Sequence, residues 1–460
     1  MAEGTRIVII GGGVAGYPAA IRASHMGADV TLIERDALGG TCLNWGCVPT
    51  KALLQVASVV RTVKSADLFG IRCHGCEVDF GAVMNRKNAV VSRLTRGVGA
   101  LLKARKINVV QGTASFVDSK TVQVNETGEN IRADAILIAT GSKPCIIPVE
   151  GINGPDVMNS NQVLSMTSLP TSVVVIGGGV IGVEFAQFLA AMGTRVTILE
   201  LTPGLVPGVD RELASLLEKR TIMSGIEIVT GAAVRGIVRT GKETVVTYTV
   251  GDKTATASAD KVILTVGRRP DFSLIDVDRV GVRHENGAII VDEHMQTNVP
   301  GIYAAGDVVG GIMLAHLASA EGECAVANAL GRQSAMSYRA VPSCIYTSPE
   351  VASVGLTEEQ ARQTRDVRVG RFPFRANGKA VVLNELEGMA KIVSDGTSGE
   401  VLGVHIIGPH ATDLIAEAVL GIRKGMTAGD FAHTIHPHPT LSEVIMEAAM
   451  TLTGGAIHVP

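Results

Sequence analysis

The sequence predicts an α/β protein whose N-terminal half contains the same strand–turn–helix–strand unit twice. The chain has 460 residues, which is too long for one compact core and suits two to four domains. Glycine occurs 53 times and only 18% of the residues are charged, which is typical of a well-buried α/β protein with many tight turns. Residues 11–34 and 177–200 align without a gap and are identical at 11 of 24 positions. This repeat sets the expected organisation of the chain.

The first unit begins with a β-branched run at 7–10, which predicts a buried strand, and continues with a glycine-rich turn that opens a helix. A second strand is expected to end at Glu34, about 20 residues further on. This order of strand, glycine-rich turn, helix and acid is typical of a dinucleotide-binding unit. In such a unit the helix N-terminus holds phosphate and the acid accepts hydrogen bonds from a ribose. Three glycines are expected to make the turn, to admit the pyrophosphate and to let the helix pack closely, in the order Gly11, Gly13 and Gly16.

The second unit repeats these features after a β-branched run at 173–176, with its glycines at Gly177, Gly179 and Gly182. Its acid, Glu200, repels a 2′-phosphate and so favours NAD over NADP. Two dinucleotide sites on one chain predict two cofactors that exchange electrons, the alternative being two packing motifs without ligands. The copies differ where Pro18 aligns with Glu184. A carboxylate there is unusual for simple nucleotide binding, although a water-facing Glu is the ordinary alternative.

Two cysteines follow the first unit, Cys42 and Cys47 in GGTCLNWGCVPTK at 39–51. A disulfide closing so small a ring adds little stability, so a structural role is unattractive. A helix-like run from Lys51 to Val60 places Cys47 near a helix N-terminus, where the dipole and the Lys51 charge favour a thiolate. We therefore predict a reactive, reversible disulfide. Two reduced thiols or half of a metal site are the alternatives, but no second nearby pair completes a zinc site.

Together with GRRP at 267–270 and AAGD at 304–307, this motif resembles the pyridine nucleotide–disulfide oxidoreductases, flavoproteins in which FAD, a redox-active disulfide and NAD(P) act in series. The resemblance covers essentially the whole chain. It implies an α/β fold with two Rossmann-like dinucleotide-binding domains, a central domain and an α+β C-terminal dimerisation domain. The expected boundaries are 1–147 for the FAD-binding domain, 148–270 for the NAD-binding domain, 271–338 for the central domain, which contributes to the FAD site, and 339–460 for the interface domain.

The resemblance also implies which side chains meet the cofactors. FAD lies on the first copy and NAD on the second, and Lys51 pairs with Glu184 beside the flavin. Gly267 is implied to contact NAD together with the three glycines of the second unit. The further residues implied at FAD, beside the first set of glycines and Glu34, are Lys51, Thr140, Gly141, Ser142, Asp307, Met313, Leu314, Ala315 and His316.

A candidate base lies in HPHPTLSE at 436–443, because histidine has the near-neutral pKa that thiol–disulfide proton transfer needs. Glu443 is suited to orient an imidazole. By resemblance His438 is the acid–base residue and reaches the disulfide of the other subunit, which implies a homodimer with a shared active site. A metal at His433, His436 and His438 is the alternative, which is disfavoured because the prolines would splay the ligands. Cys73 and Cys76 lie outside any βαβ unit and are expected to be ordinary loop thiols.

Within the family, HPHPTLSE and Glu200 are most similar to the members that oxidise protein-bound dihydrolipoamide with NAD, with Pro437 in place of the usual Ala. This similarity implies two partners, a lipoyl domain and the acyltransferase core of a 2-oxoacid dehydrogenase complex. One alternative is an NADH-dependent reductase of another small disulfide, as in glutathione reductases. A flavoprotein scaffold subunit is a second, weakened by the intact set of catalytic residues.

Composition excludes several other classes of protein. A net charge of −3 gives no reason to expect nucleic acid as a partner. Glycines and Pro18 interrupt the apolar stretch 7–21, and glycines, Glu184 and Gln187 interrupt 172–193, so we predict strands and buried helices there and no membrane span. Seven irregularly spaced cysteines do not form a secreted disulfide framework. We therefore expect a cytoplasmic enzyme.

Overall fold

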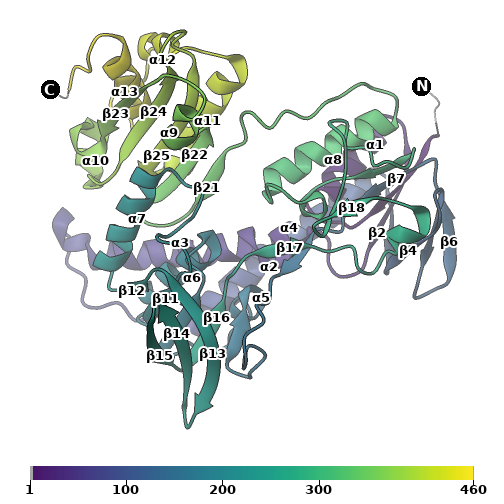
Figure 1. Ribbon diagram of the computed structural model, residues 1–460, viewed down its shortest axis with the longest axis horizontal. Helices are drawn as coiled ribbons and strands as arrows, with labels where there is room; N and C mark the ends of the chain where they lie inside the picture. The colour runs from purple at the N-terminus through teal and green to yellow at the C-terminus, as the bar shows by residue number, and fades with distance from the viewer. Residues whose placement is uncertain (1–3, 459–460) are drawn as a thin grey trace.

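The computed structural model describes residues 4–458, in which helices surround three five-stranded sheets (Figure 1). Two of these sheets are parallel and the third, near the C-terminus, is antiparallel. The mixed α/β class predicted from the sequence is therefore confirmed.

The first parallel sheet has the strand order β20-β7-β1-β2-β3. Its β-branched strand β1 is buried on both faces, as the apolar run predicts. Helix α1 (Gly16–His25) packs on α8 (Ala315–Ala329), and β20 brings the stretch 271–338 into this sheet. The bounds of the strands are β1 Arg6–Ile10, β2 Asp29–Glu34, β3 Asn108–Gln111, β7 Ala135–Ile138 and β20 Ile302–Ala304.

The second parallel sheet has the order β12-β11-β10-β16-β9 and reproduces the first unit. Arg6 pairs with Asp29 in the first sheet, and the residues 166 positions later, Ser172 and Arg195, pair in the second. The sequence repeat is thus also a repeat of strand register. The elements are β9 Val157–Asn159, β10 Ser172–Ile176, α6 Val180–Ala191, β11 Arg195–Leu199, α7 Arg211–Met223, β12 Glu227–Val229 and β16 Lys261–Leu264.

The antiparallel C-terminal sheet has the order β21-β22-β25-β24-β23, and α11 and α13 pack against it. Strand β25 (Val401–Gly408) is buried along its whole length because it lies inside this sheet. The other elements are β21 Ser343–Ile345, β22 Glu350–Gly355, β23 Val367–Pro373, β24 Met389–Asp395, α11 Ala411–Lys424, α12 Ala428–His433 and α13 Glu443–Thr453.

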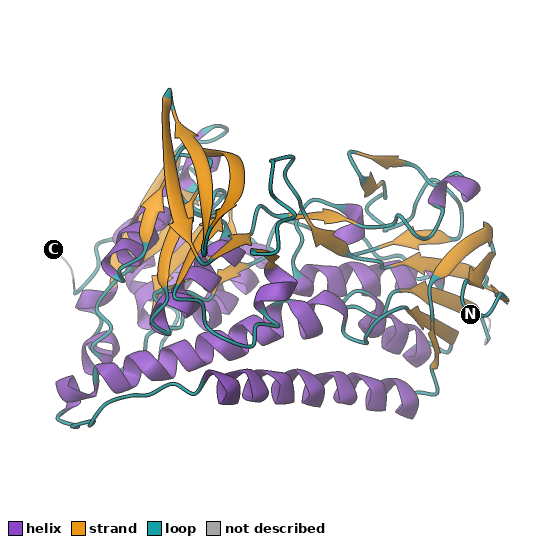
Figure 2. Ribbon diagram, turned by 90° about the horizontal axis from the view of Figure 1, so that it is seen from below, coloured by secondary structure: helices purple, strands orange, loops and turns teal. Residues whose placement is uncertain are grey.

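Long helices connect the first unit to the second (Figure 2). Helix α3 (Cys47–Lys64) follows the short α2 (Gly40–Trp45) and packs on α4 (Phe80–Ala104). Leu53 and Leu54 of α3 lie in one apolar core with Phe185 of α6. This packing fixes the start of α3 between the two nucleotide-binding units.

Smaller elements complete the fold. A three-stranded antiparallel sheet extends the second unit and consists of β13 Ala232–Thr240, β14 Glu243–Val250 and β15 Lys253–Ala259. The remaining elements are η1 Ala66–Phe69, β4 Ala114–Asp118, β5 Thr121–Val124, β6 Glu129–Arg132, β8 Ser142–Pro144, α5 Ser160–Val163, β17 Arg268–Pro270, η2 Val277–Val280, β18 His284–Glu285, β19 Ala288–Ile289, η3 Asp307–Val309, α9 Glu358–Arg362, η4 Phe374–Ala376 and α10 Gly378–Leu383. Over residues 4–458, the search for a helix both long enough and apolar enough to cross a bilayer finds none.

The close packing of α8 near the start of α1 leaves no room for a side chain at Gly322. A Cβ at Gly322 would lie 2.3 Å from the backbone oxygen of Ala15, so we expect Gly322→Ala to destabilise the protein by about 1–3 kcal/mol. Gly97, on the exposed side of α4, has no atom within 4 Å of that position. Gly97→Ala should instead be neutral or stabilise by about 0.5–1 kcal/mol. Urea unfolding followed by circular dichroism compares the two variants, and equal effects would contradict this packing.

Candidate active site

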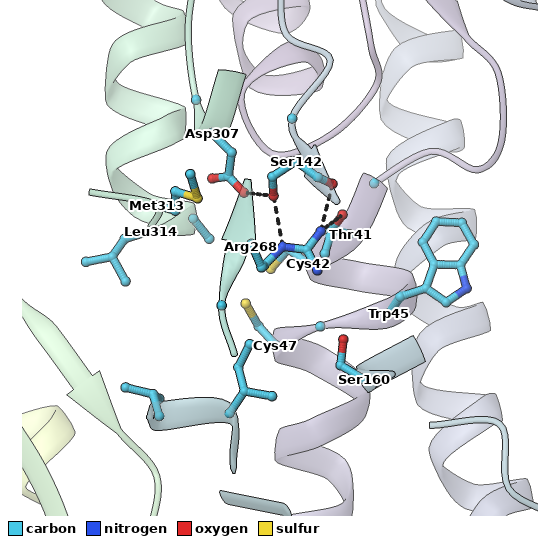
Figure 3. A pocket seen from close by; sticks show the side chains of 18 of the residues that line it. Thr41, Cys42, Trp45, Cys47, Ser142, Ser160, Arg268, Asp307, Met313 and Leu314 are labelled. Atoms are coloured by element: carbon cyan, nitrogen blue, oxygen red, sulfur yellow. Dashed lines mark hydrogen bonds between the residues drawn. The ribbon is translucent and has the colours of Figure 1, made fainter. Parts of the chain in front are cut away.

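A cavity of about 1690 Å³ lies between the two nucleotide-binding units (Figure 3). Most of the residues implicated by the sequence line this cavity. The predicted residues in its wall are Gly11, Gly13, Glu34, Cys42, Cys47, Lys51, Thr140, Gly141, Ser142, Gly177, Gly179, Glu184, Glu200, Gly267, Asp307, Met313, Leu314, Ala315 and His316. Gly16 and Gly182 lie behind it, where a Cβ would come within 1.8 Å of Gly11 O and 2.0 Å of Gly177 O.

The two acids at the ends of the second strands occupy equivalent places. Gly12 N donates to Glu34 Oε2 over 2.6 Å, and Gly178 N donates to Glu200 Oε2. The other oxygen of each carboxylate accepts a backbone N–H from two residues further on, at 2.7 Å in both cases. Each acid is therefore held against its glycine-rich turn, at the edge of the cavity where a ribose is expected.

The wall of the first unit fits a polar ligand. Thr140 follows β7, and its Oγ1 is buried with no hydrogen-bond partner among the described residues. A buried hydroxyl without a partner is costly unless a bound group satisfies it. The size of the cavity, the duplicated glycine turns and this hydroxyl together fit the two dinucleotides expected from the sequence.

Cys42 lies on α2 and Cys47 is the first residue of α3, which starts four residues before the helix-like run noted in the sequence. The hydrogen bond between the two thiols is the main cause that lowers the pKa of Cys47, to about 7, and it raises that of Cys42. Burial opposes the lowering at Cys47, the positive charge of Lys51 adds to it, and Glu184 opposes it. Near neutral pH, Cys47 is therefore partly a thiolate while Cys42 keeps its proton.

Lys51 and Glu184 come together from α3 and α6. Lys51 Nζ lies 3.0 Å from Glu184 Oε1 and 2.9 Å from Oε2. The Glu184 side chain is only 3% exposed, so it is not a surface residue. Glu184, which aligns with Pro18 of the first copy, thus forms a half-buried ion pair in the wall of the cavity, and its partner Lys51 lies one helical turn from Cys47.

Arg268, in the GRRP motif, makes contacts that the sequence alone does not predict. Its Nε donates to Ser142 Oγ over 2.8 Å, and its Nη2 donates to Ser142 O over 2.7 Å and to Thr41 Oγ1 over 3.3 Å (Figure 3). Ser142 Oγ in turn donates to Asp307. Arg268 therefore joins the segment before Cys42 to two of the stretches expected at FAD.

His438 and Glu443 are paired but lie apart from the cavity wall of their own chain. His438 Nδ1 is 2.8 Å from Glu443 Oε1, and Glu443 Oε2 accepts the N–H of Thr440 over 2.8 Å. The His438 side chain is 77% exposed. His436 is instead buried, with Nε2 3.0 Å from Glu417. One chain thus presents an oriented, solvent-facing imidazole and does not bring it to the cysteines.

Other candidate ligands do not converge. Over residues 4–458, no three His, Cys, Asp or Glu side chains are grouped to hold a metal ion. Cys73 and Cys76 are both exposed in the loop between η1 and α4. They lie outside the cavity wall, as do His433 and His436.

Two substitutions beside Cys47 should shift its pKa in opposite directions. Glu184→Gln removes a negative charge that raises the pKa of Cys47, so this pKa should fall below about 7. Cys42→Ala removes the hydrogen bond that lowers it, so the pKa should rise toward its ordinary value of about 8.5. The pH dependence of iodoacetamide alkylation of reduced protein, read on the Cys47 peptide, measures both. Shifts in the same direction would contradict the assigned causes.

Comparisons with known proteins agree with this geometry. Residues 5–322 match the sequence profile of the pyridine nucleotide-disulphide oxidoreductases, and residues 341–449 match that of their dimerisation domain. A dihydrolipoyl dehydrogenase of Bacillus subtilis (strain 168) is 42% identical over 457 residues, which cover 98% of this chain and 99% of the relative. A dihydrolipoyl dehydrogenase 2 of Haloarcula marismortui is 39% identical, covering 99% of this chain and 98% of that protein.

Solved structures are similar along nearly the whole chain. The crystal structure of LpdA from Mycobacterium tuberculosis superposes with a TM-score of 0.91 at 28% identity, covering 98% of this chain and 100% of that one. The HOCl-induced flavoprotein disulfide reductase RclA from Escherichia coli superposes with a TM-score of 0.86 at 29% identity, covering 96% of this chain and 98% of that one. The chain belongs to the pyridine nucleotide-disulphide oxidoreductase family, which confirms the predicted enzyme class and the cofactors FAD and NAD.

Proposed function

We propose that this enzyme oxidises protein-bound dihydrolipoyl groups with NAD, using FAD and the Cys42–Cys47 pair. The observation that carries the proposal is a cysteine pair with divergent pKa values, set between two nucleotide-binding units. The full-length similarity to several dihydrolipoyl dehydrogenases supports this choice of substrate.

The proposed cofactor sites follow the repeat. FAD binds against the first unit, where Glu34, Thr140 and Asp307 lie, and NAD binds against the second, where Gly179, Glu200 and Gly267 lie. When bound, FAD supplies a two-electron carrier between the cysteine pair and NAD. The Lys51–Glu184 pair lies where the two units meet and fixes a positive charge there. The β20 strand, which joins the first sheet, supports a contribution of 271–338 to the FAD site.

The thiol chemistry uses the divergent cysteines. His438 of the partner subunit, oriented by Glu443, removes a proton from one substrate thiol. The resulting thiolate attacks Cys42 Sγ of the oxidised pair, and the Cys42–Cys47 bond breaks with Cys47 leaving as a thiolate. This leaves a mixed disulfide between Cys42 and the substrate. The second substrate thiol attacks the substrate sulfur of that bond, which breaks, and its proton passes to Cys42, while the first proton stays on His438 of the partner subunit. The low pKa of Cys47 suits a leaving group, and the raised pKa of Cys42 suits the sulfur that ends as a thiol.

The expected assembly is a homodimer, which the match to the dimerisation domain supports. An exposed His438 that is already paired with Glu443 is consistent with a base offered to another subunit. We propose domains at 1–147, 148–270, 271–338 and 339–460, with the last forming the dimer interface. The proposed protein partners are a lipoyl domain and the acyltransferase core of a 2-oxoacid dehydrogenase complex.

Reduction of another small disulfide with NADH is the second candidate function. The similarity to RclA, described as a flavoprotein disulfide reductase, favours this candidate. Both functions use the same cysteines, base and cofactors, so they differ in which disulfide or dithiol enters the site.

A substrate comparison separates the two candidates. We expect purified holoenzyme to reduce NAD rapidly with dihydrolipoamide as donor, and to oxidise NADH slowly with glutathione disulfide. Absorbance at 340 nm measures both reactions, and a Cys47→Ser variant gives the background. Turnover with glutathione disulfide but not with dihydrolipoamide would replace the first candidate by the second.

Mixed dimers test whether His438 acts in the partner subunit. His438→Ala and Cys47→Ser homodimers should each lose at least about 100-fold in activity, because one lacks the base and the other the thiolate. A heterodimer of the two, isolated with two affinity tags, contains one complete site and should regain about half of the wild-type rate. An inactive heterodimer, with flavin still bound, would mean that His438 does not serve the other subunit.

A further inference from the structure

Tyr346 contacts both members of the Lys51–Glu184 pair. It follows β21, within the segment matched by the dimerisation domain. Its backbone N–H donates to Glu184 Oε1 over 2.9 Å. Lys51 Nζ lies 4.5 Å from the centre of its ring. The ion pair formed by the first and second units is thus completed by a residue of the loop that follows the first strand of the third sheet.

The loop that carries Tyr346 is itself fixed to α6. Gln187, which is buried and lies almost one helical turn after Glu184, accepts the N–H of Ser348 over 2.7 Å. Two side chains of α6 therefore hold the backbone at positions 346 and 348. With its backbone held at both places, the ring of Tyr346 is kept over the Lys51 ammonium.

The ring of Tyr346 also restricts the position of the Lys51 ammonium. The Glu184 carboxylate binds one side of the ammonium, yet the Lys51 side chain is 31% exposed. The face of an aromatic ring attracts a cation through its quadrupole, and this attraction grows as water is excluded. Burial and then the nearby Cys344 raise the pKa of the Tyr346 phenol to about 12, so the ring is neutral at physiological pH.

We propose that Tyr346 is a positioning residue whose ring holds the Lys51 ammonium beside Glu184 and within electrostatic reach of the Cys47 sulfur. The C-terminal sheet thereby helps to set the charge of the redox centre of its own chain. The significance for turnover rests on the proposed function, whereas the effect on Cys47 is a property of this chain and needs no dihydrolipoyl substrate.

The test is the titration of Cys47 in reduced holoenzyme, followed by alkylation of its peptide. Tyr346→Phe keeps the aromatic face and should leave the pKa of Cys47 unchanged. Tyr346→Leu keeps the backbone N–H but removes the aromatic face, so the Lys51 charge is held less firmly and the pKa should rise by about half a unit. Bound flavin and circular dichroism verify that both variants are folded.

A ring of similar size provides a second test of the proposal, which does not depend on the stability of Tyr346→Leu. A pentafluorophenyl ring at the same position fills nearly the same space but reverses the quadrupole, so it should raise the pKa of Cys47 relative to Tyr346→Phe. Equal pKa values for the phenyl and pentafluorophenyl proteins would overturn the proposal, as would equal shifts in Tyr346→Phe and Tyr346→Leu. Inactivity toward dihydrolipoamide with these shifts present would instead reject the proposed substrate and leave Tyr346 in its role.

Discussion

The ion pair between Lys51 and the buried Glu184 is the constraint on which the rest of the site depends. A carboxylate that is 3% exposed costs several kcal/mol if it loses its partner, so Glu184 requires a cation at this place. Lys51 reaches it only because α3 starts beside the first unit and packs into the core of the second. The interaction that neutralises Glu184 therefore also aligns the two nucleotide-binding units around one cavity.

The duplicated unit explains how this constraint arises from the sequence. Both copies use a glycine-rich turn and an acid to build equivalent edges of the cavity. They diverge in the helix, where Pro18 lies in the first turn of α1 and needs no backbone N–H there. The aligned Glu184 instead points a carboxylate toward the other unit. One scaffold thus yields two similar glycine-rich turns, and the helix of the second supplies the carboxylate that pairs with Lys51.

Local features were predictable from residue patterns, whereas long-range contacts were not, apart from the Lys51–Glu184 pair that the family resemblance implied. Glycines at 11–16 and strands at 7–10 and 173–176 follow rules of spacing and burial that act within a few residues. Arg268 binds a residue 126 positions away, and Tyr346 binds one 162 positions away, so only the tertiary structure brings them to the site. The early start of α3 has a local cause, because Pro49 suits the first turn of a helix and need not precede it.

The C-terminal part of the chain faces in two directions. Tyr346 points inward to the ion pair of its own chain, whereas His438 is 77% exposed and leaves its own cysteines without a base. On the proposed mechanism, each chain therefore supplies its own thiolate environment and its partner's proton acceptor. Separation of the subunits would then remove the base but leave Lys51 and Glu184 in contact with Tyr346. On this mechanism dimerisation supplies the base for proton transfer, while the charge that favours the thiolate belongs to the folded chain.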